Sequence, residues 1–238
     1  MSEAVREVAE ARKQGLSIGI ASGTYGVSFG ALSVAAGLDL WQTIALSLLL
    51  FTGGSQFALV GIIGSGGNPV TAVATSTLLG IRNGLYGLQL ARVLGLLGWR
   101  RAAAAQLTID ESTAISLAQR TPEGRRAGFW AGGIGVFVFW NLSTLLGALL
   151  GNALGDPRVW GLDAAAAAAF VALIWPRLQD RTGRVTAVLA AGIALVTLVP
   201  TPAGVPVLLA ALAAVVVGLL DRTPSAARDI EQPEGDLL

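Results

Sequence analysis

The stretch from Leu40 to Ile81 reads LWQTIALSLLLFTGGSQFALVGIIGSGGNPVTAVATSTLLGI and contains no charged side chain. Its length exceeds the roughly 20 apolar residues that a helix needs to cross the hydrocarbon core of a bilayer. Three further uncharged runs cover residues 14–38, 127–155 and 185–220. Because only helices and closed barrels span lipid, the sequence predicts an all-α, polytopic integral membrane protein.

The composition agrees with this class and excludes others. Of the 238 residues 53% are hydrophobic and 13% are charged, about half of the charged fraction of a soluble domain. The net charge is only +1, and the basic residues are scattered through the loops, so the sequence has no basic patch of the kind that binds nucleic acid. The chain has no cysteine and no histidine, which removes disulfides, thiolate chemistry and the usual zinc, haem and iron–sulfur ligands. We therefore expect no metal site and no cofactor.

Apolar runs separated by turn signals predict a single transmembrane domain at residues 15–220, made of a helical bundle with about seven spans. A short polar segment, residues 1–14, precedes this domain, and a polar tail at residues 221–238 is expected to be disordered. Glycine- and proline-rich turns separate several of the spans, as at residues 64–69, 155–157 and 201–202. The expected spans cover residues 15–38, 41–63, 69–97, 128–151, 159–176, 184–200 and 203–220.

The orientation follows from the arginines between the spans, because cytoplasmic loops carry an excess of Lys and Arg. Three groups lie two crossings apart, which puts the C-terminus in the cytoplasm; their members are Arg120, Arg125 and Arg126, then Arg177, Arg181 and Arg184, then Arg222 and Arg228. With seven crossings the N-terminus lies outside. It lies inside if residues 69–97 form a re-entrant hairpin or if residues 102–119 also cross.

Glycines recur at four-residue spacing in the first predicted span, at Gly15, Gly19 and Gly23, and again in the span at residues 128–151. This spacing lets membrane helices approach closely, so both spans are predicted to pack against protein. A Gly-Leu-Asp sequence at residues 37–39 and again at 161–163 also suggests a weak inverted repeat of three helices against three.

The first candidate site is the sequence from Phe51 to Phe57, in the middle of the second span. Paired glycines, Gly53 and Gly54, together with Gln56 weaken a helix at membrane depth. A break there would expose a half-helix N-terminus whose N–H groups could hold an anionic group. The alternative is a packing face of small residues with Gln56 bonded to a neighbouring helix.

The second candidate is Arg82, with Tyr86 one turn further on. Arg82 lies in the middle of an apolar stretch of 29 residues, residues 69–97, whose one other charged residue is Arg92 near its end. A charge at membrane depth is costly and usually marks a pathway. Alternatively, the span begins near Arg82 and the side chain snorkels to the interface.

The third candidate lies within residues 102–119, where Asp110 and Glu111 interrupt an Ala-rich sequence. On a helix Glu111 falls on the apolar face, which makes it a candidate proton carrier in a chain without histidine. In the other interpretation Thr108 opens a capping box that starts a short interfacial helix.

These three segments, in this order, resemble the AzlC family of branched-chain amino acid permease subunits. The resemblance implies a bacterial plasma-membrane protein that exports leucine, isoleucine and valine together with a small membrane protein of the AzlD family. Two positions depart from the family pattern, which has an Asn two residues before the arginine and a His after it. This chain has Gly80 and Asn83 there, so that histidine cannot be its proton carrier.

A branched-chain amino acid needs a cradle for its carboxylate, one for its ammonium group and an apolar pocket. The Gly53–Gly54 backbone and Arg82 suit the carboxylate, and Gln56 or Glu111 suits the ammonium group. We expect the side chains of Phe51, Phe57 and Tyr86 to line the apolar pocket. Rival hypotheses are a channel, a non-transporting anchor subunit and, with less support in a chain lacking His and Cys, an intramembrane enzyme.

Overall fold

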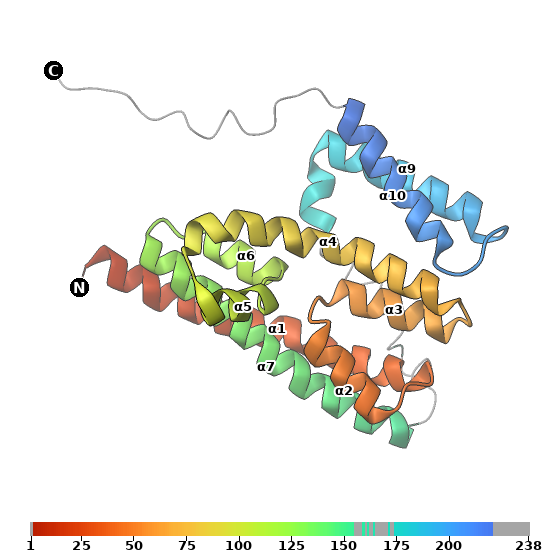
Figure 1. Cartoon of the computed structure of the whole chain (residues 1–238), viewed down its shortest axis with the longest axis horizontal. Coiled ribbons are helices and arrows are strands. Elements are labelled where there is room, and N and C mark those ends of the chain that lie inside the picture. The colour runs from red at the N-terminus through yellow and green to blue at the C-terminus, as the bar shows by residue number, and fades with distance from the viewer. Residues whose placement is uncertain are drawn as a thin grey trace.

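Two long helices form the frame of the molecule in this computed structural model, which describes residues 2–154, 159, 161, 164, 171 and 174–220. They are α1, Glu3–Ala35, and α7, Pro122–Leu154. At 1.5 Å per residue each helix is about 50 Å long, enough to cross the hydrocarbon core and extend into both interfaces. Figure 1 shows them lying side by side along the long axis of the molecule.

Glycines bring α1 and α7 into backbone contact. A Cβ atom on Gly15 would lie 2.7 Å from Ala131, and one on Gly19 would lie 2.7 Å from the carbonyl carbon of Gly135. The contacting positions advance together along both helices, so α1 and α7 run parallel. The predicted close packing of the two glycine-rich helices is confirmed.

The second predicted span is broken into α2, Leu40–Leu49, and α3, Gly54–Gly64. Each half is about 15 Å long, half of the hydrocarbon core. The two halves fold back on each other (Figure 1), and the Gln56 amide links them across the break by donating to the Leu46 carbonyl at 3.3 Å. The end of α3 returns to the end of α1, where Gly64 packs against Ala36. The α2–α3 pair is therefore a re-entrant hairpin.

The next helix, α4, is continuous over Pro69–Leu94 and runs back along the frame. It starts with an Asn68 cap that accepts from the Val70 N–H, and it ends at Gly95 in the left-handed conformation. Since α4 begins beside the α2–α3 hairpin and ends near the start of α7, it makes one full pass. Residues 69–97 are therefore not a re-entrant hairpin.

A second hairpin enters from the opposite end of the frame. It consists of α5, Gly98–Gln106, and α6, Asp110–Leu117. After α6 the Gln119 amide donates to Gln14 of α1 at 3.3 Å, so the chain has returned to the end where α1 starts. Figure 1 shows α5 and α6 toward the end that carries the N-terminus, and α2 and α3 toward the other end.

These hairpins correct two expectations. The segment 41–63 turns back instead of crossing. Residues 102–119, for which a crossing and a short interfacial helix from Thr108 were the alternatives, instead form the second part of α5 and the re-entrant return of α6. The inverted repeat expected between residues 15–38 and 128–151 is contradicted, because inverted repeats would make α1 and α7 antiparallel. The inverted relation is instead between two other units. The first unit is α1 followed by the α2–α3 hairpin, and the second is α4, which runs in the opposite direction, followed by the α5–α6 hairpin.

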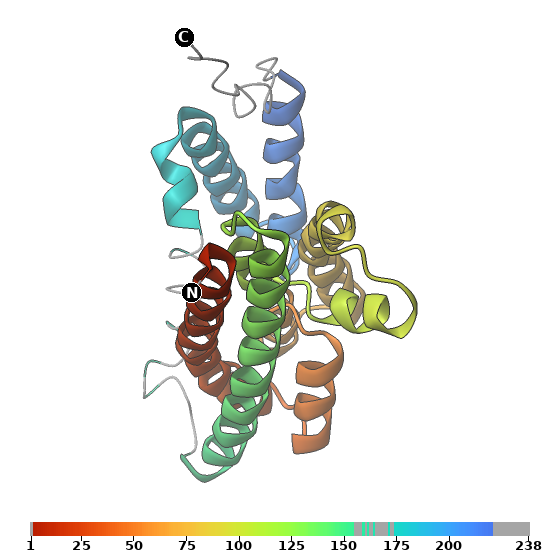
Figure 2. The ribbon, with the colours of Figure 1, turned by 90° about the vertical axis from the view of Figure 1, so that its left-hand side faces the viewer.

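The C-terminal part contains a 3₁₀ turn, Trp175–Gln179, and two helices, α9, Arg181–Leu198, and α10, Val205–Leu220. Viewed along the long axis in Figure 2, α9 and α10 lie to one side of the α1–α7 pair. Their connecting turn reaches the start of α4, where the Thr75 hydroxyl donates to the Gly204 carbonyl at 3.4 Å. By length and composition α1, α7 and α9 qualify as membrane spans within the described residues.

Other expectations cannot be compared with the structure. Most of the span predicted at 159–176, the turn at 155–157, residues 162–163 of the sequence repeat and the tail at 221–238 lie outside the described residues.

Candidate functional site

The breaks of the two hairpins meet in the middle of the frame. The Gln106 amide, at the end of α5, donates to the Leu48 carbonyl near the end of α2 at 2.8 Å. Ile109 and Phe51, one from each break, belong to the same buried apolar cluster. Backbone that is not helical therefore lies at membrane depth from both sides, which is tolerated only where protein or a polar cavity surrounds it.

Both breaks start their second helix in the same way. The Gly53 N–H donates to the Gln56 side-chain oxygen at 3.0 Å, and the Ile109 N–H donates to the Ser112 hydroxyl at 3.1 Å. In each case a side chain three residues into the turn satisfies an N–H group at the helix start. The predicted cap at Thr108 is wrong: α6 begins two residues later, and the Thr108 hydroxyl donates to the Ala104 carbonyl.

Glycine is required at the first break. Gly53 has φ 62° and ψ −84°, a conformation that residues with a Cβ atom rarely adopt. Behind the break, Trp140 of α7 lies against Phe29 and Phe57, with ring centroids 6.0 Å apart in both pairs. This aromatic cluster fixes α3 against α1 and α7, so the break rests on a rigid support.

Arg82 connects the two breaks. Its guanidinium forms an ion pair of 2.8 Å with the Asp110 carboxylate, at the start of α6, and a longer contact of 3.5 Å with the Thr52 carbonyl. The two side chains are 32% and 23% exposed, respectively. Arg82 lies in the central turns of α4 and points to the hairpins, a geometry that differs from that of an arginine snorkelling to the interface.

Two residues in contact at this ion pair carry a buried donor without a hydrogen-bond partner in the described part of the chain. They are Arg82, at its Nε, and Thr52, at its hydroxyl. The Ser55 hydroxyl, which lies 3.6 Å from the Cβ position of Gly80 on α4, has none either. Buried polar atoms nearly always have partners in folded proteins, so the unpaired donors of Arg82 and Thr52 are consistent with a polar ligand or water at this place.

The helix ends add fixed partial charges to this region. The N-termini of α3 and α6 and the C-termini of α2 and α5 all lie at the breaks. A helix N-terminus carries partial positive charge and a C-terminus partial negative charge. The region therefore offers partial charges of both signs close together, which suits a small molecule that carries both charges.

The remaining candidates take different positions. Gln56 is fully buried and both ends of its amide hold the α2–α3 hairpin together, while Gly54 is buried in the first turn of α3. Glu111 faces α1, where it hydrogen-bonds Ser22. Tyr86 is half-buried and lies one turn beyond Arg82 on α4.

The sequence analysis included Thr52 and Ser55 in its first candidate segment but gave Thr52 no role, and it did not pair Arg82 with Asp110. One signal was available for the threonine. Thr52 and Thr108 each stand immediately before the residue whose N–H is capped, so the two breaks share a threonine at the same place. A search for a repeated break, in place of a repeated helix, could have found this relation.

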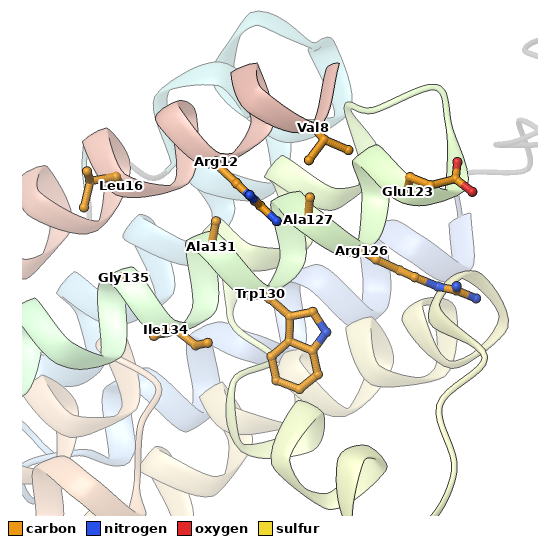
Figure 3. Close-up of a pocket in the computed structure, with 10 residues that line it drawn as sticks. All are labelled: Val8, Arg12, Leu16, Glu123, Arg126, Ala127, Trp130, Ala131, Ile134 and Gly135. Carbon is orange, nitrogen blue, oxygen red and sulfur yellow. The ribbon is translucent and has the colours of Figure 1, made fainter. Parts of the chain in front are cut away.

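A separate groove lies on the outer side of α1 and α7, away from the breaks. Its volume is about 680 Å³, and Figure 3 shows Arg12, Glu123 and Arg126 near one end, Trp130 next to them and the apolar Leu16 and Ile134 beyond. Charged groups followed by a tryptophan and then by aliphatic side chains match the order met on entering a bilayer.

Long apolar helices, two re-entrant hairpins and exposed aliphatic faces define a polytopic α-helical membrane protein. The chain belongs to the AzlC family, since the AzlC protein family matches residues 17–154, from α1 to the end of α7. This membership is consistent with a role in membrane transport.

Relatives with known sequences support the membrane assignment. An uncharacterized membrane protein of Haemophilus influenzae is 21% identical over 73% of this chain and 72% of its own length. An uncharacterized membrane protein of Helicobacter pylori strain 26695 is 25% identical over 73% of this chain and 76% of its own length, and one of strain J99 is 23% identical over the same shares. No solved structure matches the chain.

Proposed function

We propose that this protein is the large subunit of a secondary transporter that exports branched-chain amino acids across the bacterial plasma membrane. The observation that carries the proposal is the position of Arg82 between two re-entrant breaks, beside buried donors without partners. Discontinuous helices that meet near the middle of the bilayer are a common way to build substrate sites in secondary transporters.

The site suits the chemistry of an amino acid. Arg82 and the N–H group of Gly54 are the proposed ligands of the substrate carboxylate, since a guanidinium binds a carboxylate through two parallel hydrogen bonds. The Gly53 N–H already donates to the Gln56 side chain. Phe51 and Phe57, which line the α2–α3 break, and Tyr86 supply apolar surface for a branched side chain. Glu111 or Asp110 is the proposed carrier of a coupling proton.

The proposed topology has both termini in the cytoplasm. Glu7, near the N-terminus, accepts hydrogen bonds from the backbone N–H groups of Arg120 and Thr121, so α1 starts beside the arginine-rich loop before α7. The positive-inside rule then puts the N-terminus inside. The α9–α10 turn lies near the start of α4, at the end of the frame away from the N-terminus. From there α10 leads the chain back to the cytoplasmic side.

We further propose that a small AzlD-family membrane protein completes the transporter. The proposal rests on the family resemblance and on the many exposed aliphatic side chains of α9 and α10, of which Val188, Leu195 and Val196 are examples. Lipid covers such surfaces in a single subunit, and a partner helix covers part of them in a complex.

The test measures leucine efflux from loaded membrane vesicles that contain the chain with or without a co-expressed AzlD-like subunit. We expect saturable efflux and leucine counterflow that require both chains. Full efflux by the purified single chain would contradict the two-subunit proposal. An ionic conductance without counterflow would identify a channel, and no leucine movement in either preparation would leave the anchor-subunit hypothesis as the better one.

A further inference from the structure

The Asp110 carboxylate occupies the position on Arg82 that the proposed substrate carboxylate would need. The ion pair measures 2.8 Å. We infer that Asp110 makes this site selective for zwitterions: the substrate carboxylate takes over Arg82 while Asp110 turns to the substrate ammonium group. The inference rests on the proposed function and deepens it, because it assigns the selection of amino acids over simple carboxylic acids to one side chain.

The charge balance of the site leads to this role. Arg82 and Asp110 neutralise each other, and no further ion pair lies near them among the residues described. A carboxylic acid without an amino group would displace Asp110 from Arg82 and leave one negative charge without a partner in a half-buried place, which is costly. A zwitterion brings its own cation, so every charge keeps a partner of the opposite sign.

The geometry permits the exchange without dismantling the hairpins. The caps of both breaks depend on Gln56 and Ser112, and neither cap uses the Asp110 carboxylate. The Arg82 Nε and the hydroxyl of Thr52, whose carbonyl contacts Arg82, are donors without partners, so they are the donors proposed for the incoming carboxylate. Glu111, the neighbouring acid, faces Ser22 of α1 and is not the partner that Arg82 has to release.

The experiment compares the binding of leucine and of 4-methylpentanoate, which has the same apolar tail and carboxylate but no amino group. Equilibrium binding is measured on the full chain in nanodiscs, together with the AzlD-like subunit if leucine binding requires it. In the native protein we expect leucine to bind and the acid to bind at least about tenfold more weakly, the difference that one charge-assisted contact makes.

Asp110→Asn should change the two affinities in opposite directions. Leucine loses its ammonium partner and binds about tenfold more weakly, whereas the acid binds more tightly because no carboxylate competes for Arg82. Asp110→Glu keeps the charge and should keep the preference for leucine. Arg82→Gln should lose both ligands, because it removes the group that both carboxylates need.

The outcomes separate this inference from the proposed function. Leucine binding by the native chain supports the proposed function whatever the variants do, and its absence counts against that function. The inference would be overturned by an Asp110→Asn protein that has the same unfolding temperature as the native protein and also keeps the native preference for leucine. A variant that is folded and binds neither ligand would overturn it as well, because a freed Arg82 should bind the acid.

Discussion

The Arg82 guanidinium of α4 lies 2.8 Å from the Asp110 carboxylate at the start of α6 and 3.5 Å from the Thr52 carbonyl at the end of the other break. One side chain on a continuous helix thereby contacts both re-entrant hairpins. Any movement of one hairpin away from α4 must lengthen at least one of these two contacts. In the proposed transporter, Arg82 would therefore couple the binding of its substrate to hairpin movement.

The first prediction is that leucine export requires the charge and the shape of Arg82. Arg82→Gln and Arg82→Met should lower the apparent affinity in counterflow by about tenfold to hundredfold, because a charge-assisted contact is lost. Arg82→Lys should restore part of the activity, since an ammonium group cannot form two parallel hydrogen bonds. Counterflow is measured in vesicles with matched protein levels.

Arg92→Gln is the matched control for these variants. Arg92 lies in the last turn of the same helix and is exposed. Its substitution should leave leucine counterflow close to that of the native protein. Native transport by a well-inserted Arg82→Met protein would remove Arg82 from the substrate site and leave it a structural role between the hairpins.

The sequence predicted the break at Gly53–Gly54 but not the direction of the chain after it. Paired glycines weaken a helix wherever they stand, and hydropathy is the same whether α3 continues across the membrane or folds back. The direction depends on contacts between distant residues, such as Gly64 against Ala36. The same reason hid the Arg82–Asp110 pair, because the register of α4 against the α5–α6 hairpin cannot be read from either segment alone.

The close packing of the glycine-rich face of α1 was predictable from the sequence. The direction in which its partner, α7, runs was not. Four-residue spacing at Gly15, Gly19 and Gly23 indicates a flat face for close approach. The direction of α7 relative to α1 depends on how many passes lie between them. That number changes when residues 41–63 and residues 102–119 turn back, which their local sequence does not determine.

The second prediction concerns backbone strain at the first break. Gly53→Ala should destabilise the protein by about 1–3 kcal/mol, the usual cost of holding a residue with a Cβ atom in an unfavourable conformation. Space is not the cause, because a Cβ atom at Gly53 would lie 3.9 Å from Trp140. Gly61→Ala is the control in α3, the helix that follows the break, with nothing within 4 Å of its Cβ position. Thermal unfolding in detergent measures both, and equal unfolding temperatures would show that the break tolerates an alanine.

The third prediction concerns the α1–α7 contact. Gly19→Ala should destabilise the protein by about 1–3 kcal/mol or more, because the added methyl group meets the backbone of Gly135 at 2.7 Å and the backbone cannot give way cheaply. Gly84→Ala, with open space around its Cβ position, should leave the stability unchanged or raise it slightly. Thermal unfolding distinguishes the two variants. If both unfold at the same temperature, the parallel packing of α1 on α7 is not as close as described.

The last prediction is that the two hairpins open to opposite sides of the membrane. Ser65 follows α3 at the end of the first hairpin, and Ala118 follows α6 at the end of the second; both are exposed. The chain has no cysteine, so Ser65→Cys and Ala118→Cys each create a single reactive thiol. Ala118 lies beside the arginines that precede α7, and the positive-inside rule puts it in the cytoplasm.

A maleimide that cannot cross membranes should therefore label Ser65→Cys on cells whose outer envelope has been removed and whose plasma membrane is intact. It should label Ala118→Cys only after the plasma membrane is permeabilised. The unsubstituted chain is the control for background labelling. The reverse pattern would invert the orientation but keep the hairpins on opposite sides. Labelling of both positions from one side would contradict the fold itself, because α4 would then not cross the bilayer between the two hairpins and Arg82 could not join their breaks at its centre.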